Sequence, residues 1–263
     1  TAAYQGYVSS ISGMLEQSDA IGDQVVRLLT DPGDITRKEI QTRLDQSIAT
    51  SQQLEEQAAA LVVPKQLVEQ HIHQFFVMVM QFRLRGLTDL KPSLMNALEL
   101  QDVEVPSEQI SRALAYLTNS DFLYKEVFVP KVTDLLASEE VSGVSVPDTK
   151  FLADTDLASK SRVQEFLAVL KGIESLQAVH GVAITKVLVS PDDKQIAAGK
   201  THNLSSSDEL AFLVSVENQG NMAEKEVPVV VTLVSPDKTE PQTVTVTIPE
   251  LKSKEELTVT VKG

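Results

Sequence analysis

Apolar residues recur at three- and four-residue steps through the first half of the chain, the spacing of one helix face. The first run begins at Tyr4 and ends before Asp31-Pro32-Gly33-Asp34, a segment of turn-forming residues. The polar Ser18 interrupts its apolar seam. The pattern predicts a long amphipathic first helix. The other apolar positions of this seam are Tyr7, Val8, Ile11, Met14, Leu15, Ile21, Val25, Leu28 and Leu29.

Capping and proline signals predict two further helices. Thr36 and Glu39 have the spacing of a capping box, which marks the start of a second helix. Pro64 suits the first turn of a third helix, which extends to Leu98. Pro92 lies within this third helix, and we expect it to kink or split the helix.

A fourth helix is predicted from Ser107, which follows a proline and is expected to be its cap, to Leu136, with a bend at Pro130. Asp121 falls near the apolar face of this helix. We place it at the edge of the seam, and the alternative is a buried carboxylate with a partner. Because the connections are short, neighbouring helices should be antiparallel. The sequence therefore predicts an elongated antiparallel bundle of four or five helices.

The segment after these helices is interpreted as a connector because residues 139–157 have no sustained periodicity. A shorter helix is predicted over about 159–178, with Gly172 and Gly181 as candidate break points. It could lie between two structural units, but we expect it to complete the bundle, because its apolar stripe needs a large surface to cover it. The helical domain is thus predicted to span residues 1–180.

The period changes from 3.6 to 2 in the C-terminal part, where threonines alternate with valines and an isoleucine over 243–248. This alternation is typical of half-buried antiparallel strands. Two similar segments, 188–194 and 233–238, each predict a strand that ends in a Pro-Asp turn. Residues 182–263 are therefore predicted to form an all-β, sandwich-like domain.

One turn in this part is more specific than the alternation. A strand ends in Asn218-Gln219-Gly220, and a valine-rich strand over 227–233 and a late strand after a polar turn follow. This arrangement resembles CARDB-type domains, bacterial immunoglobulin-like modules named for cell adhesion. The resemblance covers roughly residues 182–263, with Asn218 and Gly220 as the family-like turn. It implies an Ig-like β-sandwich in an extracytoplasmic module that binds protein or has a structural role, without catalytic residues.

The sequence also departs from that family. Ser253-Lys254-Glu255 stands where the family often has a Pro-Gly turn, and the chain stops about two strands short of a full sandwich. We therefore expect Leu257–Val261 at an exposed sheet edge. We also expect the natural chain to continue past Gly263.

Composition excludes several classes of function. The net charge of −14 argues against nucleic acid and against direct docking on an anionic membrane. The absence of cysteine excludes disulfides, thiolate metal sites and cysteine nucleophiles. No stretch reaches the roughly 18 apolar residues of a transmembrane helix. Because the chain starts at Thr1 and Tyr4 already belongs to a helical pattern, we expect an upstream extension that could carry a membrane anchor.

A search for chemistry finds no catalytic constellation, cofactor motif or metal site. His71 and His73, two residues apart on a helix, point to different faces and are interpreted as surface residues. Arg83 and Arg85 lie beside an apolar helix face. They could contact an anionic ligand, but surface or inter-helix ion pairs are more common. Asp192-Asp193 is interpreted as an exposed acidic turn rather than a calcium site.

These observations predict a non-enzymatic, extracytoplasmic bacterial protein at the cell surface, tethered to the membrane by a segment outside this chain. The helical bundle would be a stalk or spacer, and the β domain would bind a protein or a cell-envelope component, with no cofactor. The alternative is the ectodomain of a membrane sensor with a small ligand near Arg83 or Arg85. A hydrolase is the third and weakest hypothesis.

Overall fold

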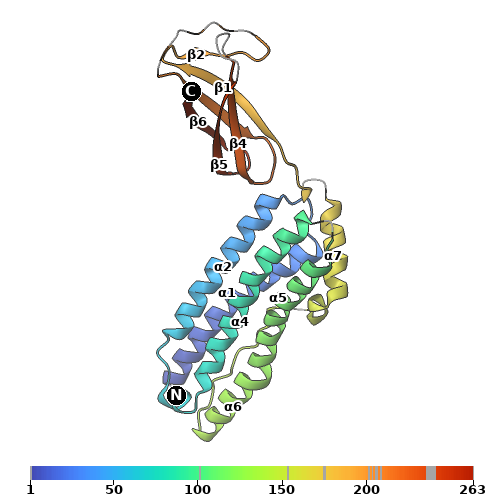
Figure 1. Cartoon of the computed structure of the whole chain (residues 1–263). Coiled ribbons are helices and arrows are strands. Elements are labelled where there is room, and N and C mark those ends of the chain that lie inside the picture. The colour runs from blue at the N-terminus through green and yellow to red at the C-terminus, as the bar shows by residue number, and fades with distance from the viewer. Residues whose placement is uncertain are drawn as a thin grey trace. The chain divides into compact units, whose positions relative to one another are not determined.

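The computed structural model describes residues 2–100, 102–152, 154–173, 176–200, 202, 204, 207, 209–234 and 241–262. The chain divides into two compact units, Thr1–Gln177 and Ala178–Gly263, and each is described by itself. The first unit is helical and the second consists of antiparallel strands in two sheets (Figure 1). The predicted order of an α region followed by a β region is confirmed.

Long helices joined by short connections make up the helical unit. At the start of α2 the predicted capping box is present. The Thr36 hydroxyl accepts a hydrogen bond from the Glu39 N–H, and the Glu39 carboxylate accepts one from the Thr36 N–H. The helices are α1 (Ala2–Thr30), α2 (Arg37–Ala59), α3 (Lys65–Glu69), α4 (Ile72–Glu99), α5 (Glu104–Leu123), the π-helical turn η1 (Tyr124–Phe128), α6 (Val129–Ser138), the 3-10 turn η2 (Thr155–Ala158) and α7 (Lys160–Gly172).

Contacts at the helix ends show that neighbouring long helices alternate in direction. Near the start of α4, His73 contacts Tyr7, at the start of α1, and Ala58, at the end of α2. At the other end of α4, the Arg37 side chain, at the start of α2, donates a hydrogen bond to the Leu98 carbonyl. Thus α1 and α4 run in one direction and α2 in the other. The predicted antiparallel arrangement is confirmed for these neighbours.

The connector is the main addition to the predicted helical core. Its residues Phe151 and Leu152 are buried in the same core as the long helices. α7 then covers this core with one apolar face and ends at Gly172, one of the two predicted break points, so it is shorter than the predicted helix over 159–178. The buried side chains of α7 are Val163, Phe166, Leu167 and Leu170.

Some local predictions about the helices differ from the structure. α4 is not split at Pro92, and the alternative that this proline kinks the helix stays a prediction. This proline is exposed, so water can reach the carbonyl that its ring leaves without a partner. The break lies instead before α4, at His71, whose φ is 56°. Ser107 is not a cap but lies buried within α5, which begins at Glu104. The bend expected at Pro130 stays a prediction, and the π-helical turn η1 ends just before this proline.

The strands of the β unit pair antiparallel in two sheets. One sheet has the order β2-β1-β3-β6 and the other consists of β4 and β5. Facing side chains from both sheets form one core, which includes Phe212 and Val261, paired across β3 and β6, and Ile248 of β5. The strands are β1 (Val182–Ser190), β2 (Lys194–Gln195), β3 (Ala211–Asn218), β4 (Glu224–Leu233), β5 (Gln242–Leu251) and β6 (Glu256–Lys262).

Turns and edges in the β unit largely follow the predictions. A turn over Pro191–Asp193 connects β1 to β2, as the first Pro-Asp segment predicts. The second such turn, 235–238, lies outside the described residues. β6 is the last strand of its sheet in the described part of the chain, so the predicted edge position of Leu257–Val261 is confirmed. Asp192 and Asp193 are exposed, as expected.

Candidate functional site

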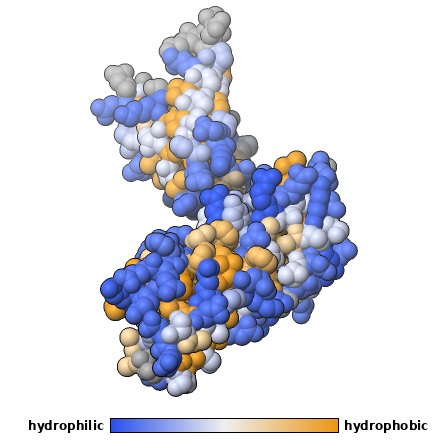
Figure 2. Space-filling model, turned by 90° about the horizontal axis from the view of Figure 1, so that it is seen from below, coloured by the Kyte–Doolittle hydropathy of each residue, from blue (hydrophilic) through white to orange (hydrophobic). Residues whose placement is uncertain are grey.

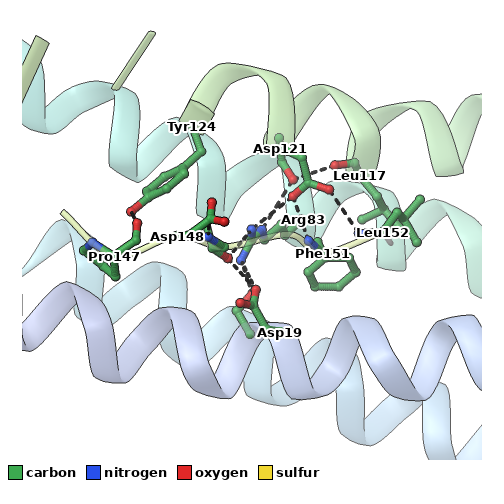
Figure 3. A network of polar contacts seen from close by, with 12 residues as sticks. Asp19, Arg83, Leu117, Asp121, Tyr124, Pro147, Asp148, Phe151 and Leu152 are labelled. Atoms are coloured by element: carbon green, nitrogen blue, oxygen red, sulfur yellow. Dashed lines mark hydrogen bonds and ion pairs between the residues drawn. The ribbon is translucent and has the colours of Figure 1, made fainter. Parts of the chain in front are cut away.

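The most concentrated polar chemistry in the helical unit surrounds Arg83, whose side chain is 1% exposed. Arg83 projects from α4, and its hydrogen-bond partners come from α1, from α5 and from the connector (Figure 3). The five N–H groups of its guanidinium have five side-chain acceptors, so its hydrogen-bonding capacity is satisfied. The acceptors are Ser120 Oγ (3.3 Å, from Nε), Ser18 Oγ (2.8 Å) and Asp19 Oδ1 (3.3 Å, both from Nη1), and Asp121 Oδ1 (3.2 Å) and Thr149 Oγ1 (3.0 Å, both from Nη2).

Asp121 of α5 binds both Arg83 and the connector backbone. Its Oδ1 also accepts the N–H of Phe151 at 2.8 Å, and its Oδ2 accepts the N–H of Leu152 at 3.0 Å. Its side chain is buried, so the prediction that it lies at the edge of the seam is wrong. The connector covers this face of α5, and the helical pattern gives no sign of that cover.

The connector lies between α1 and α5 (Figure 3). Phe151 places its ring 5.1 Å from Arg83 Cζ, which is a cation–π distance. On the α1 side, a Cβ at Gly22 would lie 2.2 Å from the Phe151 carbonyl oxygen, so only glycine permits this approach. Tyr124, beyond Asp121 in the chain, donates its hydroxyl hydrogen to the Pro147 carbonyl at 2.5 Å. Side chains of three helices thus hold one extended segment.

Burial sets the electrostatics of this cluster. Loss of solvation lowers the pKa of Arg83, and the carboxylates of Asp121 and Asp19 oppose that effect. The guanidinium still stays charged, because arginine does not lose its proton in proteins. Burial also raises the pKa of Tyr124, so its hydroxyl keeps the proton that it donates to the connector.

Arg83 and Arg85, the two arginines of the ligand hypothesis, are not brought together. Arg85 is exposed and pairs with Asp89 one turn later on α4, at 2.7 Å. Arg83 forms inter-helix ion pairs and Arg85 forms a surface ion pair, which are the two common roles that the sequence indicates for these arginines. A ligand contact at either residue stays a prediction.

The predicted surface histidines differ from each other. His71 is exposed, as expected, but His73 is half-buried. Its Nδ1 lies 3.0 Å from the Tyr7 hydroxyl and its Nε2 lies 3.0 Å from the Ala58 carbonyl. Burial lowers the pKa of His73. This histidine is therefore a polar contact among three helices, and the surface interpretation is wrong for it.

The family-like turn of the β unit is a second candidate site. Asn218 is completely buried, and its Nδ2 donates to the carbonyls of Met222 (2.6 Å) and Leu251 (2.9 Å). Its Oδ1 accepts the N–H of Gly220 at 2.9 Å. A Cβ at Gly220 would lie 2.2 Å from the Val179 carbonyl oxygen, which explains the glycine. Asn218 thereby links the end of β3 to the end of β5, strands of different sheets.

The surface of the helical unit has an open groove of about 440 Å³ between α4 and α5. Among its lining residues, the exposed Arg112 has no hydrogen bond or ion pair with a described residue. Hydrophobic patches on the face seen in Figure 2 are separated by hydrophilic side chains. The groove is lined by Asp89, Pro92, Ser93, Asn96, Gln109, Arg112 and Ala113.

In the part of the chain that the structure describes, no three His, Asp or Glu side chains gather closely enough to hold a metal ion. Among the described helices, none is both long enough and apolar enough to cross a bilayer.

Comparisons with known proteins add no relative. No protein-family model, curated protein or solved structure matches the chain.

Proposed function

We propose that the chain is a non-enzymatic extracytoplasmic bacterial protein at the cell surface, with a helical stalk and an Ig-like module that binds a protein or a cell-envelope component. One observation carries the stalk role. Tyr4 contacts Gln66 of α3, the short helix that precedes α4, whereas the Leu176 carbonyl accepts a hydrogen bond from Arg37 at the far end of α4. The chain thus begins the helical unit at one end of α4 and leaves it at the other.

The number of times that the chain runs along the length of the helical unit explains this separation, and each such run is called a pass. α1, α2, α4 and the α5–α6 pair make four passes, and the connector with α7 makes a fifth. An even number of passes would return the chain to the end where it began. With 28 residues in α4, the two ends lie about 40 Å apart at ~1.5 Å per residue. Such an arrangement favours a spacer, which has to separate two attachment points.

The Ig-like, CARDB-type assignment of the second unit rests on the resemblance and has two supports. Its two antiparallel sheets share one core, as in a β-sandwich. The Asn218–Gly220 turn, the most specific part of the resemblance, has a clear structural task, because it links strands of the two sheets.

The ligand-sensing alternative has less support at Arg83. Each guanidinium N–H has an acceptor within the protein. An anion could bind there only by displacing the buried Asp121 or the half-buried Asp19, and an unpaired buried carboxylate is costly.

Two measurements test the proposal. External protease added to intact cells of the source organism should degrade the native protein, and purified full-length chain should co-sediment with isolated cell-envelope fragments. The expected result is degradation without lysis, together with co-sedimentation that excess unlabelled chain reduces. Protection of the native protein until the cells are lysed, with recovery in the cytosolic fraction, would overturn the proposal.

A further inference from the structure

We propose that the contact between α1 and the connector, held by the Arg83 cluster, is a mechanical clamp that resists tension along the helical unit. The Arg83 cluster is defined as the side chains of Ser18, Asp19, Arg83, Ser120, Asp121 and Thr149. The biological use of this clamp rests on the proposed stalk function. The clamp itself is a property of the helical unit and can be measured separately.

Tension would reach the unit through α1 and α7. The beginning of α1 lies at one end of α4, and Leu176, just after α7, lies at the other. A pull on these two ends draws α1 toward the first end, and draws the connector and α7 toward the second. The α1–connector contact lies between the two points of attachment and therefore carries the load.

The orientation of this contact places it in shear. Asp19 of α1 contacts Thr149 of the connector, and Gly22, further along α1, contacts Phe151, further along the connector. The two segments therefore run in the same direction side by side. When they are pulled from opposite ends, all their contacts must slide together, whereas contacts that are peeled apart break one at a time.

The Arg83 cluster adds resistance at this point. Thr149 donates its hydroxyl hydrogen to Asp19 and accepts a hydrogen bond from Arg83, so one connector side chain is tied to both α1 and α4. Asp121 of α5 holds the N–H groups of Phe151 and Leu152. The pull acts on α1 and α7 and not on α4 or α5, so these two helices anchor the connector to the core. Arg83, Asp121 and Thr149 are buried, which excludes the water that would otherwise replace the bonds among them and the connector backbone as they stretch.

A single-molecule force experiment on the full-length chain tests the clamp. The chain has no cysteine, so handles attach only at introduced cysteines. Exposed positions Ala3 and Ala178, each replaced by Cys, give the pull along the unit. Ala3→Cys with Val62→Cys gives a control pull, because both positions lie at the same end and the helices peel apart.

The decisive variant is Thr149→Val, which preserves shape and removes the hydroxyl. Thr88→Val is the matched control, because its exposed hydroxyl bonds only its own helix, at the Leu84 carbonyl. We expect Thr149→Val to raise the unfolding rate at fixed force by about fivefold or more in the 3–178 pull, because loss of one ordinary hydrogen bond allows about fivefold and the Thr149 hydroxyl makes two. In the 3–62 pull the change should be smaller than twofold, and Thr88→Val should change neither.

Two outcomes would overturn the clamp. One is an unchanged rate for Thr149→Val in the 3–178 pull. The other is an equal acceleration in both pulls, which would indicate a general loss of stability. Neither outcome bears on the cellular location of the protein, and a cytosolic location would leave the force measurement intact, so the two proposals fail separately.

Discussion

Asp121 Oδ1 lies 3.2 Å from Arg83 Nη2, and both side chains are buried where α4, α5 and the connector meet. We expect Asp121→Asn to destabilise the protein by about 3–5 kcal/mol, because it breaks a buried ion pair and leaves Arg83 short of negative charge. The new side-chain amide also points an N–H donor at the Leu152 backbone N–H, which in the natural chain has a carboxylate oxygen as its acceptor. Urea unfolding followed by circular dichroism measures the change.

Asp89→Asn is the matched control for that variant. It removes the same charge from the ion pair with the exposed Arg85, where the pair is one turn apart on the helix surface. A loss of no more than about 0.5 kcal/mol is expected there. Equal effects of the two substitutions would show that burial of the Arg83 pair has no energetic consequence.

Gly22 and Gly13 offer a second comparison within α1. A Cβ at Gly22 meets the Phe151 carbonyl oxygen at 2.2 Å, whereas a Cβ at Gly13 meets nothing within 4 Å. Gly22→Ala should therefore displace the connector and cost about 1–3 kcal/mol. Gly13→Ala should instead stabilise the helix by up to about 1 kcal/mol, since alanine is the better helix former.

The test is whether the urea midpoint falls for Gly22→Ala and rises for Gly13→Ala. Hydrogen exchange adds a local measurement, because Gly22→Ala should increase exchange at the N–H groups of Phe151 and Leu152. Stabilisation by both alanines would contradict the close packing of the connector on α1.

The sequence predicts the helices well because their apolar seams repeat over many turns. It predicts the Arg83 cluster poorly, because the members of the cluster come from four segments, α1, α4, α5 and the connector, that no local pattern brings together. A signal was nevertheless present. Ser18 interrupts the seam of α1 and Asp121 lies by the seam of the fourth predicted helix, and buried polar groups require partners. Polar residues on the seams of separate helices predict a shared buried network, although not its geometry.

The connector shows a second limit of sequence reasoning. Residues 139–157 have no periodicity, so nothing local distinguishes an extended segment packed in the core from an exposed loop. Phe151 and Leu152 are adjacent apolar residues within it, and both are buried. Their burial depends on Gly22 and Asp121, which are about 130 and 30 residues away in the chain.

Asn218 supplies a prediction for the β unit. Asn218→Asp preserves shape, but an ionised carboxylate cannot donate to the carbonyls of Met222 and Leu251. The buried Leu251 carbonyl and the part-buried Met222 carbonyl would lose their donor and face a negative charge, so we expect a loss of about 2–4 kcal/mol at neutral pH. Gln219→Glu makes the same amide-to-carboxylate change at an exposed neighbour, where it replaces a hydrogen bond to Glu217 with two solvated like charges and should cost no more than about 1 kcal/mol.

Hydrogen exchange at the backbone N–H groups of β3 and β5 reports this difference, because it follows the opening of the β unit alone. A small effect of Asn218→Asp, comparable to that of Gln219→Glu, would show that the turn does not depend on the buried amide. It would also remove one support for the Ig-like assignment.

His73 makes the stability of the helical unit depend on pH. The Ala58 carbonyl can only accept, so neutral His73 carries its hydrogen on Nε2, and Nδ1 accepts from the Tyr7 hydroxyl. Protonation puts a second N–H on Nδ1, which then faces the hydrogen of that hydroxyl and forces it to turn away. A positive charge is also poorly solvated there, and burial lowers the pKa of His73 below its ordinary value of about 6.5.

The direction of the effect follows from proton binding. Between the lowered pKa of the folded state and about 6.5, the unfolded chain binds more protons at this site than the folded chain does. The contribution of neutral His73 to the free energy of unfolding should therefore be fully present above about pH 6.5. It should decrease as the pH is lowered toward the folded-state pKa. His73→Gln, which can still donate to Ala58, should flatten the dependence of the urea midpoint between about pH 7.5 and 5.5. His71→Gln, at an exposed position, should leave it as in the natural chain, and an equal pH dependence with and without His73 would show that another group is responsible.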